Sequence, residues 1–346
     1  MPRRSLLEAR YDRLEVKTRP PFDAETAHKT ELDRDRTIRE PVPYKADLLG
    51  SADLQLSQTE VEHFKREGFL VKRGLVPASE EFKAIVDYVW ETVPEGVMSR
   101  EDPTSWVDEP HERWPIGAAA RIGVLQHSAW KMRSPHRYGR EESLLKVTAN
   151  HPRVRAVVKQ FLGERLERAE RVRGVYVVLP KSPSVEGRLG PHVDHSAAQL
   201  SAMVLIDEIP PRTGGFTVWP GSHARLHRYW TSCQGAHFNQ RIKNEFDEEF
   251  KAILRDIVPV EFVGEAGDVV FWHPRLIHSA GVNYSAELNA SLIRYAIPCD
   301  FQKPGYTFYD DDDLGPGSKH QWWVDTRHFR EDPAPTSTNM WDDWSI

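Results

Sequence analysis

The first clear hydrophobic pattern in the chain begins at Ser57. Ser57 and Glu60 have the spacing of a capping box, and Gly68 follows as a stop signal. From Phe82 onward, apolar residues recur at i, i+3, i+4 and i+7, which is the spacing of a core-facing helical stripe. The pattern therefore predicts helices over 58–67, 79–92 and 154–162.

Beyond the third predicted helix, the pattern changes to short apolar runs separated by Gly- and Pro-rich turns such as 211–215 and 220–222. A helical insertion over 247–257 interrupts them. Short strands at this spacing, without regular intervening helices, indicate a mainly β protein with flanking helices, built as an antiparallel barrel or jelly roll. The predicted strands are 172–179, 200–206, 216–219, 258–263, 268–272 and 291–298.

The two ends of the chain differ from this central region. Residues 1–50 hold 11 Lys or Arg and 10 Asp or Glu with scattered prolines, which predicts a charged N-terminal arm. Residues 51–305 form the predicted barrel domain, and 94–135, rich in Pro, Trp, His and Arg, is interpreted as a lid loop. Residues 306–346 form a Trp-rich tail that we expect to pack back on the barrel. Either end could instead join two copies in a homo-oligomer.

Composition narrows the possible functions. With 46 Lys and Arg against 52 Asp and Glu, the net charge of −6 does not favour a nucleic-acid partner. No apolar run approaches the roughly 18 residues of a membrane span, so we expect no membrane partner and a cytoplasmic location. The chain has only 2 Cys, which are too few for a cysteine-rich zinc site. Any metal ion would therefore be held by His and carboxylate side chains.

One candidate metal motif is His192-Val193-Asp194, just before a predicted strand. In an extended chain, His192 and Asp194 point to the same face. Such a triplet is expected about once by chance in this chain, so on its own it is weak. A third candidate ligand, His278, follows a later strand of the same predicted barrel. Two His and one carboxylate on one face make the facial triad of non-haem Fe(II) oxygenases.

Arg294 is the candidate anchor for a cosubstrate. It lies in the predicted strand 291–298 with apolar neighbours. A guanidinium among apolar residues favours a bidentate anion, such as the far carboxylate of a dicarboxylate. Pairing with an ordinary Asp or Glu remains the alternative.

At this level the chain resembles the phytanoyl-CoA dioxygenase (PhyH) family of Fe(II)/2-oxoglutarate-dependent oxygenases, over roughly residues 56–301. The chain departs from the usual pattern of this family in two places. Ser279-Ala280-Gly281, in place of Gly-Ser-Gly, follows His278, which matches the family's distal histidine. The stretch from His278 to Arg294 is also longer than is usual in the family. The matching segments are the helix-then-strand opening 61–71, the motif His192-Val193-Asp194, the glycine turn 214–216 with Pro220-Gly221-Ser222-His223, the distal segment 267–278, and Arg294-Tyr295-Ala296-Ile297.

The resemblance implies a double-stranded β-helix (a cupin-like jelly roll) and a dioxygenase that uses Fe(II), 2-oxoglutarate and O2. His192, Asp194 and His278 would bind iron, and Arg294 would bind 2-oxoglutarate. The expected reaction is hydroxylation of an unactivated C–H bond of a small molecule, a specialised metabolite or small organic acid, with release of succinate and CO2. Desaturation, epimerisation and ring formation remain open outcomes of the same chemistry.

His195 and His223 are interpreted as structural or supporting residues, and His273 as lying outside the metal site. In the lid loop, Gln126 and Trp130 are the candidate substrate contacts. The alternative functions are a cupin-like hydrolase or isomerase that uses Zn or Mn as a Lewis acid, and a non-catalytic binding module on the same barrel.

Overall fold

The computed structural model describes most of the predicted barrel and little of the two ends. The predicted arm 1–50 and tail 306–346 therefore lie largely outside the described residues, and so does His195. None of the described helices combines the length and apolar character needed to cross a bilayer. The described residues are 38–44, 53–108, 113–115, 123–126, 128–132, 139–166, 168–182, 189–194, 199–227, 240–288, 291–301, 303, 339–342 and 344–346.

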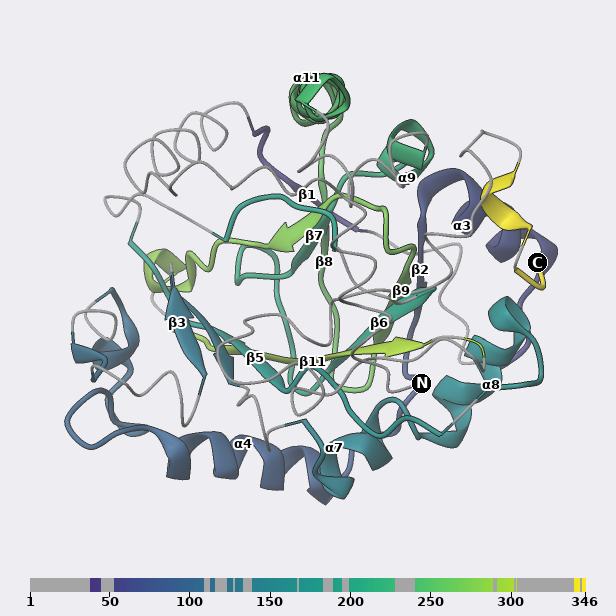
Figure 1. The fold of residues 1–346 in the computed structure, drawn as a ribbon. Helices are drawn as coiled ribbons and strands as arrows, with labels where there is room; N and C mark the ends of the chain where they lie inside the picture. The colour runs from purple at the N-terminus through teal and green to yellow at the C-terminus, as the bar shows by residue number, and fades with distance from the viewer. Residues whose placement is uncertain are drawn as a thin grey trace, which may run out of the picture.

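Two β-sheets form the centre of the molecule (Figure 1). Neighbouring strands are antiparallel throughout, apart from the parallel pair β1 and β8. The larger sheet has the order β2 (Phe69–Lys72), β9 (Val269–Trp272), β6 (Leu200–Leu205), β11 (Arg294–Phe301), β5 (Val175–Val178), β4 (Ala129–Met132) and β3 (Val124–Gln126). The smaller sheet has the order β1 (Val42–Pro43), β8 (Val260–Phe262), β7 (Phe216–Val218) and β10 (His278–Ala280).

Side chains of alternating direction give the larger sheet two buried faces. On β6, Met203 and Leu205 belong to the apolar cluster shared with strands of the smaller sheet, whereas Ala202 and Val204 belong to the cluster shared with the helices. Strands that are buried on both faces read as continuous apolar runs, as these do in the sequence. This arrangement is the double-stranded β-helix, or jelly roll, and it confirms the predicted fold class.

Helices cover both sides of the barrel (Figure 1). In this view α4 (Glu80–Thr92) and α7 (Glu142–Val147) run beneath the larger sheet, and α9 (Ser222–Leu226) and α11 (Gln240–Asp256) lie above the smaller one. The remaining helices are α3 (Gln58–Glu67), α8 (Pro152–Leu162) and the short 3-10 helices η1 (Pro103–Trp106), η3 (Ser285–Leu288) and η6 (Asn339–Trp341).

The predicted capping box of the first helix is confirmed. The Glu60 backbone N–H donates to Ser57 Oγ, and the Glu60 carboxylate accepts from the Ser57 N–H. The helix ends at Gly68, whose φ of 84° is in the left-handed region. A Cβ at Gly68 would lie 2.5 Å from His223 Nδ1, so both the turn and the packing require glycine.

Three local predictions differ from the structure. Within the interpreted lid 94–135, β3 and β4 form a hairpin at the edge of the larger sheet, and Ser128 in its tight turn has a φ of 62°. These strands are too short to give a clear alternating pattern. Helix α7 was not predicted, because its apolar run covers fewer than two turns. Helix α11 begins at Gln240, seven residues before the predicted start.

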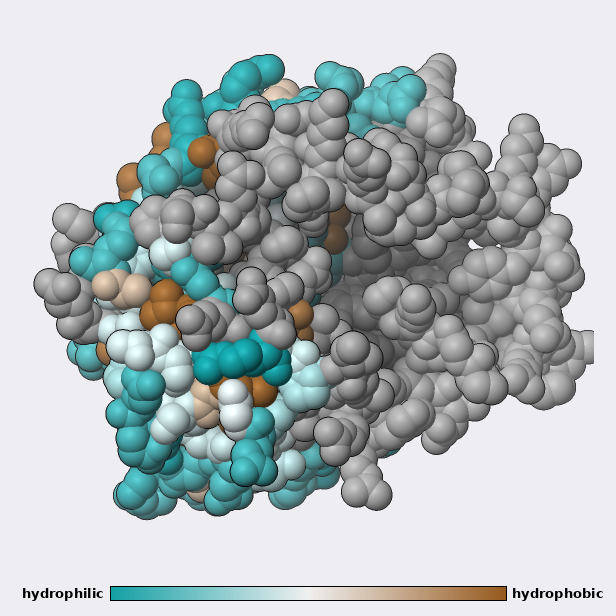
Figure 2. Space-filling view, turned by 90° about the vertical axis from the view of Figure 1, so that its left-hand side faces the viewer, coloured by the Kyte–Doolittle hydropathy of each residue, from teal (hydrophilic) through white to brown (hydrophobic). Residues whose placement is uncertain are grey.

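Described residues on the face in Figure 2 are mostly hydrophilic, and the hydrophobic ones are scattered among them. The large hydrophobic side chains that are exposed among the described residues are Val42, Tyr88, Val258 and Leu292. Val42 and Val258 lie on neighbouring segments, because β1 pairs with β8 and Val42 donates its N–H to Pro259 O. A few exposed apolar side chains are normal on a protein surface.

The last residues of the chain pack against helices α3 and α8. Trp344 lies 5.6 Å from the Phe64 ring and 6.2 Å from the Phe161 ring, and it stacks on His273. The next residue, Ser345, donates its backbone N–H to Phe161 O. For these residues, the expectation of a tail that packs on the body of the protein agrees with the structure.

We predict that Trp344→Ala lowers the free energy of unfolding by about 2–3 kcal/mol, because it removes a large aromatic surface from this cluster. Chemical denaturation measures the change. The matched control is Tyr88→Ala, which removes an aromatic side chain that is 46% exposed and should change stability by less than about 1 kcal/mol. Equal stability of Trp344→Ala and the wild type would contradict the packing role.

His223 makes stability depend on pH. Burial lowers the pKa of this imidazole to about 4. Its Nε2–H donates to Lys65 O, and Nδ1 is buried without a partner among the described residues. The folded state therefore holds His223 neutral, whereas the unfolded state binds a proton near pH 6.5. Because the unfolded state binds more protons between these values, stability falls as pH falls through this window.

We predict that lowering the pH from 7 to 5 costs about 2 kcal/mol of unfolding free energy through His223 alone. Chemical denaturation at the two pH values should show this loss in the wild type. His223→Gln, which cannot titrate, should show a loss smaller by that amount. An identical pH dependence in both proteins would contradict a neutral, buried imidazole.

Candidate metal centre

Two backbone hydrogen bonds hold the His192 and His278 segments side by side. Each residue donates its N–H to the carbonyl of the other at 2.9 Å, and β10, which begins at His278, pairs with β7. Asp194 follows two positions after His192, so an extended backbone brings it back to the same side. The structure thus brings all three sequence-predicted ligands together.

The three side chains form a compact donor set. One ligand atom from each of His192, Asp194 and His278 lies within 4.8 Å of the others. His278 Nε2 lies 3.4 Å from Asp194 Oδ2, and His192 Nε2 lies 3.8 Å from Asp194 Oδ1. Among the described residues, this is the group of His, Cys, Asp and Glu side chains that could hold a metal ion.

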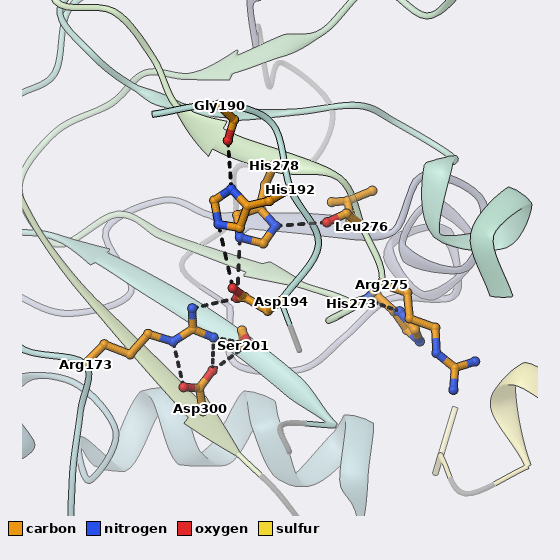
Figure 3. Close-up of polar contacts among 10 residues, drawn as sticks. All are labelled: Arg173, Gly190, His192, Asp194, Ser201, His273, Arg275, Leu276, His278 and Asp300. Atoms are coloured by element: carbon orange, nitrogen blue, oxygen red, sulfur yellow. Dashed lines mark hydrogen bonds and ion pairs between the residues drawn. The ribbon is translucent and has the colours of Figure 1, made fainter. Parts of the chain in front are cut away.

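Backbone carbonyls orient both imidazoles. His192 Nδ1 lies 2.8 Å from Gly190 O, and His278 Nδ1 lies 2.9 Å from Leu276 O (Figure 3). Because a carbonyl can only accept, each Nδ1 carries a proton, which leaves each Nε2 as the nitrogen that a metal ion would bind. Both Nε2 atoms face Asp194. Metal-binding histidines are typically held in this way.

Electrostatics keeps the donors in their metal-binding forms. Desolvation and the neighbouring His278 lower the pKa of His192 to about 3, so this imidazole is neutral near pH 7. Burial by itself would raise the pKa of Asp194, but the adjacent Arg173 guanidinium outweighs it and holds that pKa well below its usual value. Neutral imidazole nitrogens with one carboxylate suit a divalent transition metal, and the facial arrangement suits Fe(II).

The three donors differ in exposure. The side chain of His192 is 39% exposed, whereas those of Asp194 and His278 are 4% and 5% exposed. A metal ion held by these three side chains would therefore be closed off on the Asp194 side and open beside His192. An open side is required for a metal that binds further ligands during catalysis.

Arg294 is buried at the start of β11, where it pairs with Val178 of β5. Its guanidinium donates to Gly214 O at 2.9 Å and contacts the Met203 sulfur, while Nε has no hydrogen-bond partner among the described residues. Among the described residues, no carboxylate lies within ion-pair distance of it. Burial lowers the pKa of Arg294 to about 10, so the group is still cationic at neutral pH. A buried cation with an unpaired N–H fits an anionic ligand.

The sequence interpretation missed a buried ionic network behind Asp194. Arg173, two residues before β5, forms ion pairs with both Asp194 and Asp300, and Ser201 donates to Asp300 (Figure 3). The sequence does contain one indication of this network, since Arg173 and Asp300 are charged residues within apolar runs. Their pairing could not be predicted from the sequence, because it depends on the register of three strands.

The remaining candidates lie elsewhere. Trp130 is fully buried on the helix-facing side of β4 and packs against Trp114, so the structure does not bring it to the metal site. Gln126 is in β3, but its side chain lies outside the described residues. Lys131, the next residue after Trp130, takes the opposite face: it lies over the Tyr176 ring and contributes to the low pKa of His192. The sequence interpretation placed Lys131 in the lid loop 94–135 and gave it no separate role.

The two other histidines are not ligands in this arrangement. His273 points away from the triad (Figure 3), and its ring stacks on Trp344. His223 lies 5.4 Å from His273, between ring centroids, and bonds to the backbone of α3. Both positions agree with the structural roles expected for them.

Among solved structures, the fold is similar to that of several enzymes at low identity. The carbocyclase SnoK from nogalamycin biosynthesis is 18% identical with a TM-score of 0.43, over 78% of this chain and 94% of that one. The epimerase SnoN from the same biosynthesis is 18% identical with a TM-score of 0.40, over 71% and 82%. EctD from S. alaskensis is 16% identical with a TM-score of 0.38, over 77% and 81%. These likenesses are too distant to add to the assignment.

Sequence comparison is more decisive. No curated protein matches the chain. The family described as phytanoyl-CoA dioxygenase (PhyH), in contrast, matches residues 64–289, which is well over half of the 346 residues. The matched region contains the described His192, Asp194 and His278, and it agrees with the resemblance seen in the sequence. The chain therefore belongs to the phytanoyl-CoA dioxygenase (PhyH) family of Fe(II)/2-oxoglutarate-dependent oxygenases.

Proposed function

We propose that this protein is a Fe(II)/2-oxoglutarate-dependent dioxygenase that hydroxylates an unactivated C–H bond of a small organic molecule. His192, Asp194 and His278 would hold Fe(II) through two imidazole nitrogens and one carboxylate oxygen. Arg294 would bind the far carboxylate of 2-oxoglutarate. When bound, iron and 2-oxoglutarate supply the oxidising chemistry, with succinate and CO2 as by-products.

The observation that carries this proposal is that the structure contains both the donor set and the buried Arg294 guanidinium, which forms no ion pair with a described carboxylate. A Lewis-acid hydrolase could use the same three ligands, but it would have no use for such a guanidinium. A dicarboxylate cosubstrate accounts for both features at once. It would neutralise Arg294 and occupy the open side of the metal.

The protein's own contribution is placement. The carbonyls of Gly190 and Leu276 fix the imidazoles, and the backbone carbonyl of Gly214 fixes one arm of the Arg294 guanidinium. Members of the apolar cluster between the sheets contact these groups: Phe216 and Trp272 lie beside His278, and Met203 contacts Arg294. A fixed site is what a reaction at an inert C–H bond requires, because it holds the substrate bond close to the oxidant.

A small pocket lies beside the strands that carry Arg294 and His278. Its lining includes Val178, which pairs with Arg294, and Ala280, two residues after His278 in β10.

The cosubstrate assignment can be tested by thermal unfolding of the Mn(II)-loaded protein. We predict that 2-oxoglutarate raises Tm because it binds only the folded state. Pyruvate keeps the keto acid but lacks the far carboxylate, and succinate lacks the keto group, so both should raise Tm much less. Equal shifts with pyruvate and 2-oxoglutarate would contradict the role of Arg294 and favour the Lewis-acid or binding-module alternatives.

Hydroxylation itself needs a product assay. Incubation of the Fe(II)-loaded enzyme with a pool of small organic acids, 2-oxoglutarate and labelled O2 should yield a product that carries one labelled oxygen atom. An unlabelled product of unchanged mass would indicate epimerisation instead. Loss of two hydrogens would indicate desaturation or ring formation.

A further inference from the structure

The guanidinium of Arg173 is a buried ionic group beside the metal centre. This side chain is 4% exposed, and it contacts two carboxylates that are themselves buried. Nη1 lies 2.6 Å from Asp194 Oδ2. Nε and Nη2 lie 2.7 and 2.5 Å from the two oxygens of Asp300. The guanidinium also lies over the Trp272 ring, 5.8 Å from its centroid.

The bond to Asp300 fixes the guanidinium independently of Asp194. Two parallel N–H···O bonds to one carboxylate hold a planar guanidinium in a single orientation. Asp300 is held in turn by the Ser201 hydroxyl, which donates to Oδ1 at 2.6 Å, and the two residues pair directly across β11 and β6. The position of Nη1 is therefore set by the sheet.

Strand β11 connects this group to the cosubstrate side of the site. Asp300 and Arg294 are six positions apart on β11, so they point to the same face. One strand thus carries the guanidinium proposed to bind 2-oxoglutarate and the carboxylate that holds Arg173. The separation between Arg294 and Asp300 is therefore set by a single buried strand.

The contact engages one of the two oxygens of Asp194. Arg173 donates to Oδ2, which also lies 3.4 Å from His278 Nε2, while Oδ1 lies 3.8 Å from His192 Nε2. A carboxylate with both oxygens free can bind a metal through either one or both of them. Binding through both would use a coordination position that a chelating cosubstrate or O2 requires.

We propose that Arg173 is a positioning residue that restricts Asp194 to binding the metal through one oxygen. Asp300 and Ser201 hold its guanidinium in place for this purpose. The proposal rests on the proposed metal site, because it assigns Arg173 a task only if Asp194 is a ligand. It goes beyond that site because it assigns a role to Asp300 in β11, to Ser201 in β6 and to Arg173 in the segment before β5.

The test is the Fe(II) dissociation constant, measured anaerobically at pH 7 without 2-oxoglutarate, for the wild type, Arg173→Gln and Arg173→Lys. We expect both variants to bind Fe(II) about 10- to 100-fold more weakly, because a fixed hydrogen-bond partner of a ligand has been removed. Arg173→Lys keeps the positive charge but loses the fork that joins the two carboxylates. It should therefore resemble Arg173→Gln rather than the wild type.

Two results would overturn the proposal: wild-type affinity in folded Arg173→Gln, or full retention of affinity in Arg173→Lys. The second would mean that Arg173 acts only as a nearby charge. The matched control is Arg73→Gln. This substitution breaks an ion pair outside the triad, in which Arg73 Nη1 lies 2.7 Å from Asp268 Oδ2, and it should leave Fe(II) affinity unchanged. Circular dichroism checks that each variant is folded.

If the Arg173 variants do not fold, Asp300→Asn provides the second test. It leaves the guanidinium in the protein but removes the charged anchor that orients it. We expect weaker Fe(II) binding by several fold, and unchanged binding would overturn the proposal. Failure of the proposed function is distinguishable, because the wild-type protein itself would then show no specific Fe(II) binding.

Discussion

Asp194→Ala is expected to abolish specific Fe(II) binding and all 2-oxoglutarate turnover. The substitution removes the anionic donor and leaves two neutral imidazoles, which cannot offset the charge of a divalent ion. The loss of affinity should exceed the roughly 10- to 100-fold caused by losing a partner that only supports a ligand. The fold should survive, because Arg173 keeps both bonds to Asp300.

Metal content after anaerobic loading and gel filtration measures this effect. The matched control is His273→Gln, which replaces a buried imidazole only five residues from His278 that lies outside the triad. This variant should retain iron at the wild-type ratio. Stoichiometric iron in folded Asp194→Ala, or its loss in His273→Gln, would contradict the assigned ligands.

Arg294→Leu is expected to weaken 2-oxoglutarate binding by about 100-fold while Fe(II) affinity stays unchanged. The estimate corresponds to about 3 kcal/mol, the contribution of two hydrogen bonds from a charged donor. Isothermal titration of the Mn(II)-loaded protein with 2-oxoglutarate measures it. Unchanged 2-oxoglutarate affinity would show that the far carboxylate binds elsewhere.

For Arg294→Leu we also predict the effect on the stability of the fold. Because Arg294 is buried without a carboxylate partner among the described residues, replacing it with an apolar side chain removes a desolvated charge. The metal-free Arg294→Leu protein should therefore be at least as stable as the wild type in chemical denaturation. A marked loss of stability would mean that the guanidinium supports the fold rather than a ligand.

The sequence was sufficient to predict the parts of the site that depend on local spacing. His192 and Asp194 share a face because they are two apart in an extended segment, and the continuous apolar runs of β6 and β9 indicate strands that are buried on both faces. The capping box at Ser57 and the glycine stop at Gly68 define a helix without any tertiary information. These features have short-range causes, and the structure agrees with them.

Features set by strand register were not predictable in the same way. The contact between Arg173 and Asp300 exists because β11 places Asp300 opposite Ser201 and beside the segment that precedes β5. Trp130 was interpreted as a substrate residue because the hairpin of β3 and β4 gives little periodic signal. Once β4 pairs with β5, alternation assigns Trp130 to the helix side and Lys131 to the other.

The most direct test of the central claim is an anaerobic titration of the metal-free wild-type protein with Fe(II) and then 2-oxoglutarate, followed by visible absorption. Chelation of Fe(II) by the keto acid in a site of two histidines and one carboxylate should produce a weak charge-transfer band that saturates with one equivalent of iron. The band should be absent in Asp194→Ala and should require far more 2-oxoglutarate in Arg294→Leu. A folded wild-type protein that binds Fe(II) but develops no band with 2-oxoglutarate would contradict the account.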